Sequence, residues 1–465
     1  MRELPVAVIG AGPVGLAAAA NLIAHGLAVK VYECGAQAGA NVSDWRHVRL
    51  FSPWEFNIDR AARALLEPTS WRAPDAAAYP TGAELVGAYL VPLAQTPALA
   101  PVIEYGARVT AIGRRGIDKV VSRDREQHPF QLSVTDKNGR IRRELARAVI
   151  DASGTWTSPN PLGAGGIAAE GEQAQVQRID YGIPDVLGRD RAGFVGRTTL
   201  VVGAGHSAAN VLLDLAELAK QDATTRAVWA TRGTNLSRVY GGGANDQLAA
   251  RGDLGRRLRQ LVEGGRVELV AGFACVAVRE AAGQIVIEGE TSAGSRTIGP
   301  VDRIVACTGQ RPDLSLAREL RVELDPWLES ARALGPLVDP NLHSCGSVPP
   351  HGHRELSHPE SGFYTVGVKS YGRAPTFLMA TGYEQVRSVV AAIAGDLAAA
   401  DDVRLVLPET GVCTTAAVGS GGCCGGPAPA ATEACCADDA AAKAQGQSSC
   451  GCGSSAKANE AAPAQ

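Results

Sequence analysis

Residues 6–15 read VAVIGAGPVG, and residues 200–209 read LVVGAGHSAA. Each stretch is an apolar strand, then a glycine-rich turn, then an alanine-rich segment typical of a helix, which is the order of a dinucleotide-binding fingerprint. The first glycine of such a turn permits the bend, the second lets a pyrophosphate approach the backbone, and the third lets the helix pack close to the strand. Two copies in one chain predict two dinucleotide-binding units.

The first turn carries every part of the fingerprint. Residues 27–32 form the next predicted strand, which ends in Glu33, an acid about 20 residues past the turn and placed to accept ribose hydroxyls. Free N–H groups at the start of the helix would meet the phosphate charge. The residues predicted to hold the nucleotide here are Gly10, Gly12, Pro13, Val14, Gly15 and Glu33.

The second turn departs from the first in two places. Its third glycine is replaced by Ala208, and the following strand, residues 227–230, leads to Arg232 rather than to an acid. An arginine suits the 2′-phosphate of NADP, which a carboxylate would repel; a solvated surface arginine is the alternative. The residues predicted to hold this nucleotide are Gly203, Gly205, His206, Ser207, Ala208 and Arg232.

Length and composition set the broad class. A chain of 465 residues with 45% hydrophobic residues predicts two or three soluble domains. The formal net charge of −3 gives no footprint for nucleic acid or for an anionic membrane. The longest apolar stretch, residues 6–24, contains the glycine turn and lacks a basic leader, so it predicts neither a signal peptide nor a membrane span. We therefore expect a cytoplasmic protein that acts on a small molecule.

Two later strands run into glycines and define how the units connect. Residues 148–151 lead to Gly154, and residues 304–306 lead to Gly309. The repeat predicts an α/β fold of two Rossmann-like domains, with the second domain inserted into the first. The predicted division is 1–160 and 301–400 for the first domain, 161–196 for a connector, 197–300 for the second domain and 408–465 for a tail.

These features, over roughly residues 5–395, resemble the two-dinucleotide-binding flavoproteins, which include flavin-containing monooxygenases and thioredoxin-reductase-like disulfide reductases. The resemblance implies FAD at the first turn and NADPH at the second. It also implies that residues 362–367 (GFYTVG) and the helix from about residue 376 form the last FAD segment. It adds Trp45, Val109, Gly154, Gly309 and Gly367 to the predicted cofactor-binding residues.

Two departures refine the resemblance. The aspartate that usually follows the last glycine in the disulfide reductases is replaced by Val368 and Lys369, which favours the monooxygenases. The Phe-Gly-His stretch that identifies flavin-containing monooxygenases is also missing ahead of the second turn. Residues 45–54 (WRHVRLFSPW) and the connector look most similar to flavin monooxygenases of bacterial arsenic-resistance operons.

Residues 45–59 form an aromatic segment, which we expect to lie over a flat ring system. Packing in the core is the alternative role. Asn57 in this segment is the predicted catalytic residue, because its amide could hydrogen-bond an oxygenated flavin; its alternative role is that of a turn residue. His351, His353 and His358 follow in a loop rich in proline and glycine. They are candidates for a substrate pocket or a metal site, with surface positions as the alternative.

The tail predicts disorder because residues 408–465 hold no aromatic residue and are mostly Ala, Gly, Ser and Pro. Paired thiolates on such a chain favour soft ions, and trivalent arsenic would behave alike. Thiol exchange with the flavin is the alternative role. The predicted metal or metalloid ligands are Cys423, Cys424, Cys435, Cys436, Cys450 and Cys452.

We expect an enzyme in which NADPH reduces FAD, after which O2 supplies one oxygen atom to a small soft nucleophile such as a trivalent arsenical. Two alternatives stay open from the sequence. One is a disulfide reductase that uses the tail dithiols. The other is a flavoprotein whose main task is to bind a metalloid.

Overall fold

The computed structural model describes residues 3–241, 249–342, 348–375 and 377–405. The predicted cysteine-rich tail, with all six of its proposed ligand cysteines, lies outside these residues. Within the described ranges, no helix combines the length and the apolar character needed to cross a membrane.

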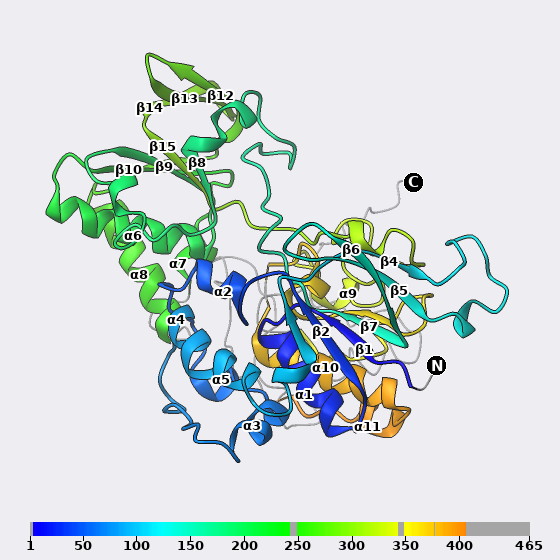
Figure 1. The fold of residues 1–465 in the computed structure, drawn as a ribbon. Helices are drawn as coiled ribbons and strands as arrows, with labels where there is room; N and C mark the ends of the chain where they lie inside the picture. The colour runs from blue at the N-terminus through cyan, green and yellow to red at the C-terminus, as the bar shows by residue number, and fades with distance from the viewer. Residues whose placement is uncertain (1–2, 242–248, 343–347, 376, 406–465) are drawn as a thin grey trace, which may run out of the picture.

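The first sheet is parallel throughout and has helices on one face and a small sheet on the other (Figure 1). Val6 and Val8 point into the core beneath helices α1 (Pro13–Ala24) and α10 (Met379–Ala394). Ala7 and Ile9 point into the core beneath the small sheet, because successive residues of a strand face opposite sides. The strand order is β16 (Phe363–Thr365), β7 (Ala148–Asp151), β1 (Val6–Ile9), β2 (Val29–Glu33) and β3 (Ile103–Tyr105), and the small sheet is β4 (Arg108–Arg114), β5 (Phe130–Thr135) and β6 (Ile141–Ala146).

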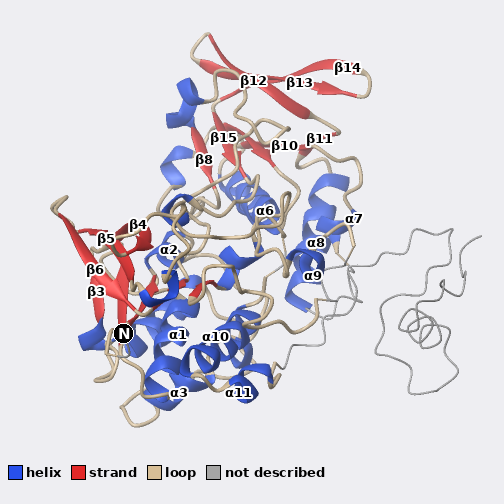
Figure 2. Ribbon diagram, turned by 90° about the vertical axis from the view of Figure 1, so that its right-hand side faces the viewer, coloured by secondary structure: helices blue, strands red, loops and turns tan. Residues whose placement is uncertain are grey.

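The second sheet repeats this three-layer arrangement. Val201 packs beneath helices α6 (His206–Gln221) and α8 (Ala249–Glu263), whereas Leu200 packs beneath a second antiparallel sheet. Figure 2 shows the helices and the antiparallel sheet on opposite sides of it. The strand order is β11 (Glu268–Ala271), β10 (Arg226–Thr231), β9 (Thr198–Val202), β15 (Arg303–Ala306) and β8 (Ile179–Tyr181), and the antiparallel sheet is β12 (Ala274–Ala281), β13 (Gln284–Thr291) and β14 (Gly294–Val301).

The second sheet lies between β7 and β16 in the chain, so the insertion predicted from the sequence is confirmed. The chain crosses between the domains twice, near Asn160 and near Gly309. The two crossing segments run side by side, and hydrogen bonds of Asn160 join them. The Asn160 N–H donates to Gly309 O at 2.9 Å, and the Asn160 side-chain oxygen accepts from Arg311 Nε at 2.9 Å. Strand β8 comes from the segment predicted as a connector, so that segment also supplies the edge of the second sheet.

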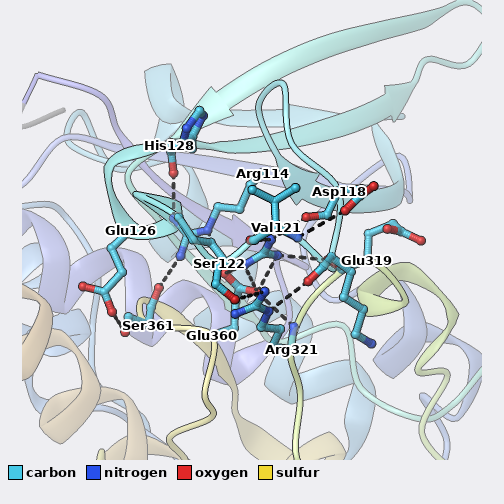
Figure 3. A network of polar contacts seen from close by, with 12 residues as sticks. Arg114, Asp118, Val121, Ser122, Glu126, His128, Glu319, Arg321, Glu360 and Ser361 are labelled. Atoms are coloured by element: carbon cyan, nitrogen blue, oxygen red, sulfur yellow. Dashed lines mark hydrogen bonds and ion pairs between the residues drawn. The ribbon is translucent and has the colours of Figure 1, made fainter.

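A buried ion-pair network joins the small sheet of the first domain to the chain between β15 and β16 (Figure 3). The Glu360 carboxylate accepts from Arg114 Nε and from Arg125 Nη2, both at 2.8 Å, and from the Arg321 backbone N–H at 2.9 Å. Arg114 lies in β4 and Arg125 in the 3-10 helix η4 (Arg125–Gln127), whereas Arg321 and Glu360 lie in loop segments ahead of β16. The network therefore sets the approach of the chain to β16.

The other helices are short and lie mainly around the first domain. They are α2 (Ala40–Asp44), α3 (Arg60–Leu66), α4 (Gly82–Leu85), α5 (Val91–Ala94), α7 (Ser237–Tyr240), α9 (Gly335–Val338) and α11 (Leu397–Asp401). Two 3-10 helices, η1 (Trp54–Phe56) and η9 (Gly367–Tyr371), carry residues of the candidate site.

Candidate functional site

The first glycine turn leaves an open cradle at the start of α1. Gly10 has φ +98°, and a Cβ atom there would lie 2.9 Å from Ala152 O. A Cβ on Gly15 would collide with Gly10 O. Gly12 caps α1 in an extended conformation, and its missing side chain points to a space with no protein atom within 4 Å. The outer two glycines are thus needed by the fold, whereas the middle one leaves room for a pyrophosphate beside free helix N–H groups.

Glu33 braces this turn from the end of β2. Its side chain is buried, and its carboxylate accepts from Ala11 N at 2.6 Å and from Gly35 N at 2.7 Å. Glu33 Oε1 also accepts from Cys34 Sγ at 3.6 Å. Oε2 retains a second acceptor position, because an ionised carboxylate offers about four lone-pair sites. The acid therefore holds the turn and keeps an acceptor position for a ligand hydroxyl.

The second turn is built like the first, but the helix that follows it lies farther from the turn. Gly203 has φ +135°, and a Cβ atom there would collide with Cys307 O, while Gly205 again has no protein atom within 4 Å of its missing side chain. Ala208 is fully buried at the position where Gly15 would collide with its own turn. Helix α6 must therefore stand farther from its turn than α1 does.

Three other predicted residues surround the second turn. His206 begins α6, and its ring meets Phe51 of the first domain edge to face at a centroid distance of 5.0 Å. Ser207 follows it in the first turn of α6 without acting as a side-chain cap. Arg232 is exposed just past β10, and its Nη1 donates to Ala164 O at 2.9 Å. The guanidinium thus sits beside the connector with most of its donors available for an anion.

The three glycines predicted at the crossings and in the last segment all adopt positive φ: +74° at Gly154, +83° at Gly309 and +71° at Gly367. A Cβ atom on Gly367 would lie 3.3 Å from Val14 Cγ2, so the last segment packs directly on the first turn. The predicted following helix, α10, begins at Met379, three residues later than expected.

Sequence reasoning missed a buried ion pair beside this contact. Lys369 Nζ lies 2.7 Å from Asp151 Oδ2 and 2.9 Å from Ser153 Oγ, and it joins η9 to the end of β7. The only sign of this ion pair in the sequence is that Val368 and Lys369 stand where the disulfide reductases usually have an aspartate. That departure shows that an aspartate is missing, but it does not point to an ion pair. A lysine in the predicted last FAD segment gives no sign of its partner 218 residues earlier.

The catalytic role predicted for Asn57 is not supported by its contacts. Asn57 is fully buried at the end of η1, and its amide nitrogen donates to Ser52 O at 2.7 Å and to Pro53 O at 3.0 Å. Its Oδ1 accepts from Ser52 Oγ at 2.8 Å. Both amide hydrogens are used within this turn, which agrees with the alternative role of a turn residue, and the catalytic role stays a prediction.

Trp45 and Val109 contribute mainly through packing. Trp45 is half-buried, and a Cβ atom on Gly82 would lie 2.9 Å from its ring and from its carbonyl oxygen. Val109 lies in β4 with its side chain in the core between the two sheets of the first domain. Any contact of Val109 with a cofactor would therefore use its backbone.

The three histidines predicted for a pocket or a metal face different partners. His351 bonds Gln385, His353 Nε2 lies 2.9 Å from Asp401 Oδ1, and His358 stacks on Phe363 at 5.8 Å. His351 and His353 do line one pocket of about 250 Å3. Across the described parts of the chain, no group of three or more His, Cys, Asp or Glu side chains is arranged to hold a metal ion.

The cysteines that the structure describes are isolated from one another. Burial raises the pKa of the Cys275 and Cys307 thiols to about 12. Cys34 is exposed, and partial burial together with the Glu33 carboxylate raises the pKa of its thiol as well. At neutral pH these three side chains are protonated thiols, which are poor nucleophiles.

Solved structures with the same architecture include a disulfide reductase and monooxygenases. The bacillithiol disulfide reductase Bdr (YpdA) from Bacillus cereus is 18% identical, with a TM-score of 0.62 over 84% of this chain and 99% of that one. DfoA from Erwinia amylovora, a cadaverine monooxygenase of desferrioxamine biosynthesis solved bound to FAD, is 13% identical, with a TM-score of 0.60 over 89% and 99%. A flavin-containing monooxygenase from Stenotrophomonas maltophilia is 20% identical, with a TM-score of 0.54 over 85% and 99%.

The comparison with curated proteins returned no match. The comparison with protein families gave a match over residues 7–333, which span both glycine turns and both crossings. The matched range covers more than half of the chain, and the matched family is one of oxidoreductases. The protein therefore belongs to the pyridine nucleotide-disulphide oxidoreductase family.

Proposed function

We propose that the protein binds FAD at the first turn and NADPH at the second, and that it acts as a monooxygenase on a small soft nucleophile. The observation that carries the proposal is the matched pair of open positions at Gly12 and Gly205, each at the start of a helix of twelve or more residues. Arg232 beside the second turn favours NADPH over NADH.

In the proposed complex, FAD would be held by the first turn, by Glu33 and by the Gly367 segment. The bound flavin would supply hydride acceptance and O2 chemistry, while the protein supplies binding, orientation and electrostatics. The balanced reaction consumes NADPH, H+, O2 and the substrate, and it yields NADP+, water and the singly oxygenated substrate. A trivalent arsenical is the substrate that we propose within this class, because its lone pair is a soft nucleophile.

The thiols favour oxygen over a disulfide as the acceptor. A disulfide reductase that works through a protein dithiol needs two thiols that can pair, and Cys34, Cys275 and Cys307 are isolated, with raised pKa values. The disulfide reductase alternative therefore depends on cysteines outside the described residues, as does metalloid binding by the tail.

The test follows NADPH oxidation and O2 uptake in the full-length FAD-loaded protein with arsenite, a methylated trivalent arsenical or a thioether. A monooxygenase should consume NADPH and O2 one to one, faster with substrate than without it, and release little H2O2. NADPH oxidation without O2, driven by an added disulfide and lost when Cys450 and Cys452 are changed to Ser, would establish the reductase instead. Stoichiometric arsenite binding with no turnover would favour the metalloid-binding protein.

A further inference from the structure

A buried polar network of three side chains stands behind the Gly367 segment and holds the backbone N–H and C=O of Gly367. The Gly367 N–H donates to Gln385 Oε1 at 2.8 Å, and the Gly367 carbonyl accepts from Ser370 Oγ at 2.7 Å. Gln385 Nε2 in turn lies 2.9 Å from Ser370 Oγ and 2.9 Å from His351 Nε2. Gln385 is fully buried on α10, and Ser370 and His351 are nearly so.

The direction of every hydrogen bond in this network is fixed by its ends. His351 Nδ1 lies 3.0 Å from Pro349 O, which can only accept, so Nδ1 carries the proton of the neutral ring. His351 Nε2 is then an acceptor and needs the Gln385 amide nitrogen as its donor. The Gly367 N–H needs the Gln385 amide oxygen as its acceptor, so the amide can take only one orientation.

The charge state of His351 agrees with this arrangement. Burial lowers the pKa of His351, opposed by its bond to Pro349 O and by the Glu355 carboxylate, so the ring is neutral near pH 7. The Tyr371 ring packs against it at 5.5 Å. The other charged groups that line the adjoining pocket are His353, Arg354, Glu384 and Asp401.

The network acts on a position that touches the first glycine turn. Gly367 has φ +71°, and its Cα faces the Val14 side chain at the start of α1. Core packing alone would not require a glutamine at a fully buried helix position, because an apolar side chain would fill the same volume without the cost of burying an amide. The amide is useful there because it orients the Gly367 peptide.

We propose that Gln385 is a positioning residue for the flavin cofactor. With the help of His351 and Ser370, Gln385 holds the Gly367 peptide against Val14. This inference rests on the proposed binding of FAD at the first turn. Gln385 would not touch the flavin, and it would act through the backbone that forms one wall of the site.

Gln385→Glu is the sharpest test, because it keeps the acceptor for Gly367 N–H and removes both donors. A carboxylate cannot donate to neutral His351, so the network reforms only when the introduced carboxylate or His351 gains a proton. We expect the FAD dissociation constant of Gln385→Glu to rise about tenfold at pH 8.5 and to recover toward the wild-type value at pH 6, as the loss of one or two hydrogen bonds implies. The wild-type constant should change little across this range.

The measurement is FAD binding to apo-protein, followed by quenching of flavin fluorescence, with far-UV circular dichroism as a check of folding. Gln260→Glu is the matched control, since it adds the same charge to an exposed position of α8. Ser370→Ala is the milder second variant. It removes the donor to Gly367 O and one acceptor of Gln385 Nε2, keeps the bond from Gly367 N–H to Gln385, and should weaken FAD binding at every pH value.

The outcomes separate the two proposals. A wild-type protein that fails to bind FAD would refute the proposed function. A wild-type protein that binds FAD, together with Gln385→Glu and Ser370→Ala proteins that bind it equally well at both pH values, would overturn the positioning role. The same conclusion would follow if the loss in Gln385→Glu did not depend on pH.

Discussion

Lys369 Nζ lies 2.7 Å from Asp151 Oδ2 with both side chains 1% exposed, so an ion pair joins the last segment of the first domain to the end of β7. Asp151→Asn would leave the buried ammonium without its hydrogen-bonded counter-charge and should lower the free energy of unfolding by about 3–5 kcal/mol. Urea denaturation measures the change. The double variant Asp151→Leu, Lys369→Met should recover much of the loss, because no buried charge then remains; an Asp151→Asn protein as stable as wild type would contradict this account.

Gly12→Ala and Gly205→Ala test the two turns separately. Each adds a methyl group where no protein atom lies within 4 Å, so stability should change by less than about 1 kcal/mol. Gly12→Ala should weaken FAD binding tenfold or more, while Gly205→Ala should retain FAD and raise KM for NADPH, because each methyl group would occupy the place of a pyrophosphate. Gly10→Ala is the control for the fold, since its φ of +98° should make it unstable. Unchanged binding in both open-position variants would disprove the assignment.

Arg232→Ala should raise KM for NADPH by about 10- to 100-fold and leave KM for NADH unchanged, because a charge-assisted hydrogen bond to the 2′-phosphate is lost. Steady-state kinetics with both nucleotides provide the comparison. Arg226→Ala is the matched control: Arg226 is exposed at the opposite end of the same strand, β10. An equal effect on both nucleotides would mean that Arg232 does not read the phosphate.

Glu360 should make the protein sensitive to acid. Burial raises the pKa of this carboxyl, but hydrogen bonds from Arg125, the Arg321 backbone and Arg114 outweigh burial and lower the pKa below 4.5. A depressed folded-state pKa stabilises the fold above the unfolded-state pKa, and this stabilisation is lost as pH falls through the folded value. We expect the wild-type unfolding free energy to fall below about pH 4.5 and that of Glu360→Gln to fall less, from a lower starting value. Parallel pH profiles would contradict this prediction.

Asp59 should have the opposite pH dependence. Burial raises the pKa of Asp59 to about 6, although the carboxylate caps α3 by accepting from Ala62 N at 2.9 Å. Because the folded-state pKa is raised, the stability that protonation gives is fully present below the ordinary pKa of 3.8 and is lost as pH rises from there to about 6. Asp59→Asn keeps a capping oxygen without the charge, so it should raise Tm most at pH 8, raise it less at pH 5, and change it little below about pH 4. A lower Tm at pH 8 would show that the charge itself is needed.

The local parts of the fold could be predicted from the sequence because neighbouring residues specify them. Gly10, Gly12 and Gly15 lie within six positions, and the turn, the strand before it and the helix after it follow from that spacing. The insertion of the second domain was also predictable, because the strands that lead to Gly154 and Gly309 bracket it. The start of α10 was misplaced by three residues because helix ends depend on capping and packing.

The candidate site was predictable only where a motif carried it. Asn57 looked available in the sequence, yet the turn at Ser52 and Pro53 uses both of its amide hydrogens. Lys369 looked like a departure from a pattern, yet it is half of a buried ion pair. Gln385 gave no signal, since it is one polar residue in an ordinary helical stretch, and His351 appeared in the sequence only as one of three candidates for a pocket or a metal site.

The sequence by itself determined two nucleotide-binding turns, their order and the nesting of one domain in the other, because these depend on backbone conformation and short-range spacing. Only the tertiary structure decided which polar groups are free and which are used. The partners of Asp151, Glu360 and Gln385 lie far away in the chain or on other elements, and burial fixes both their charge states and the direction of their hydrogen bonds. Such pairings depend on the packing of whole layers, which no local pattern records.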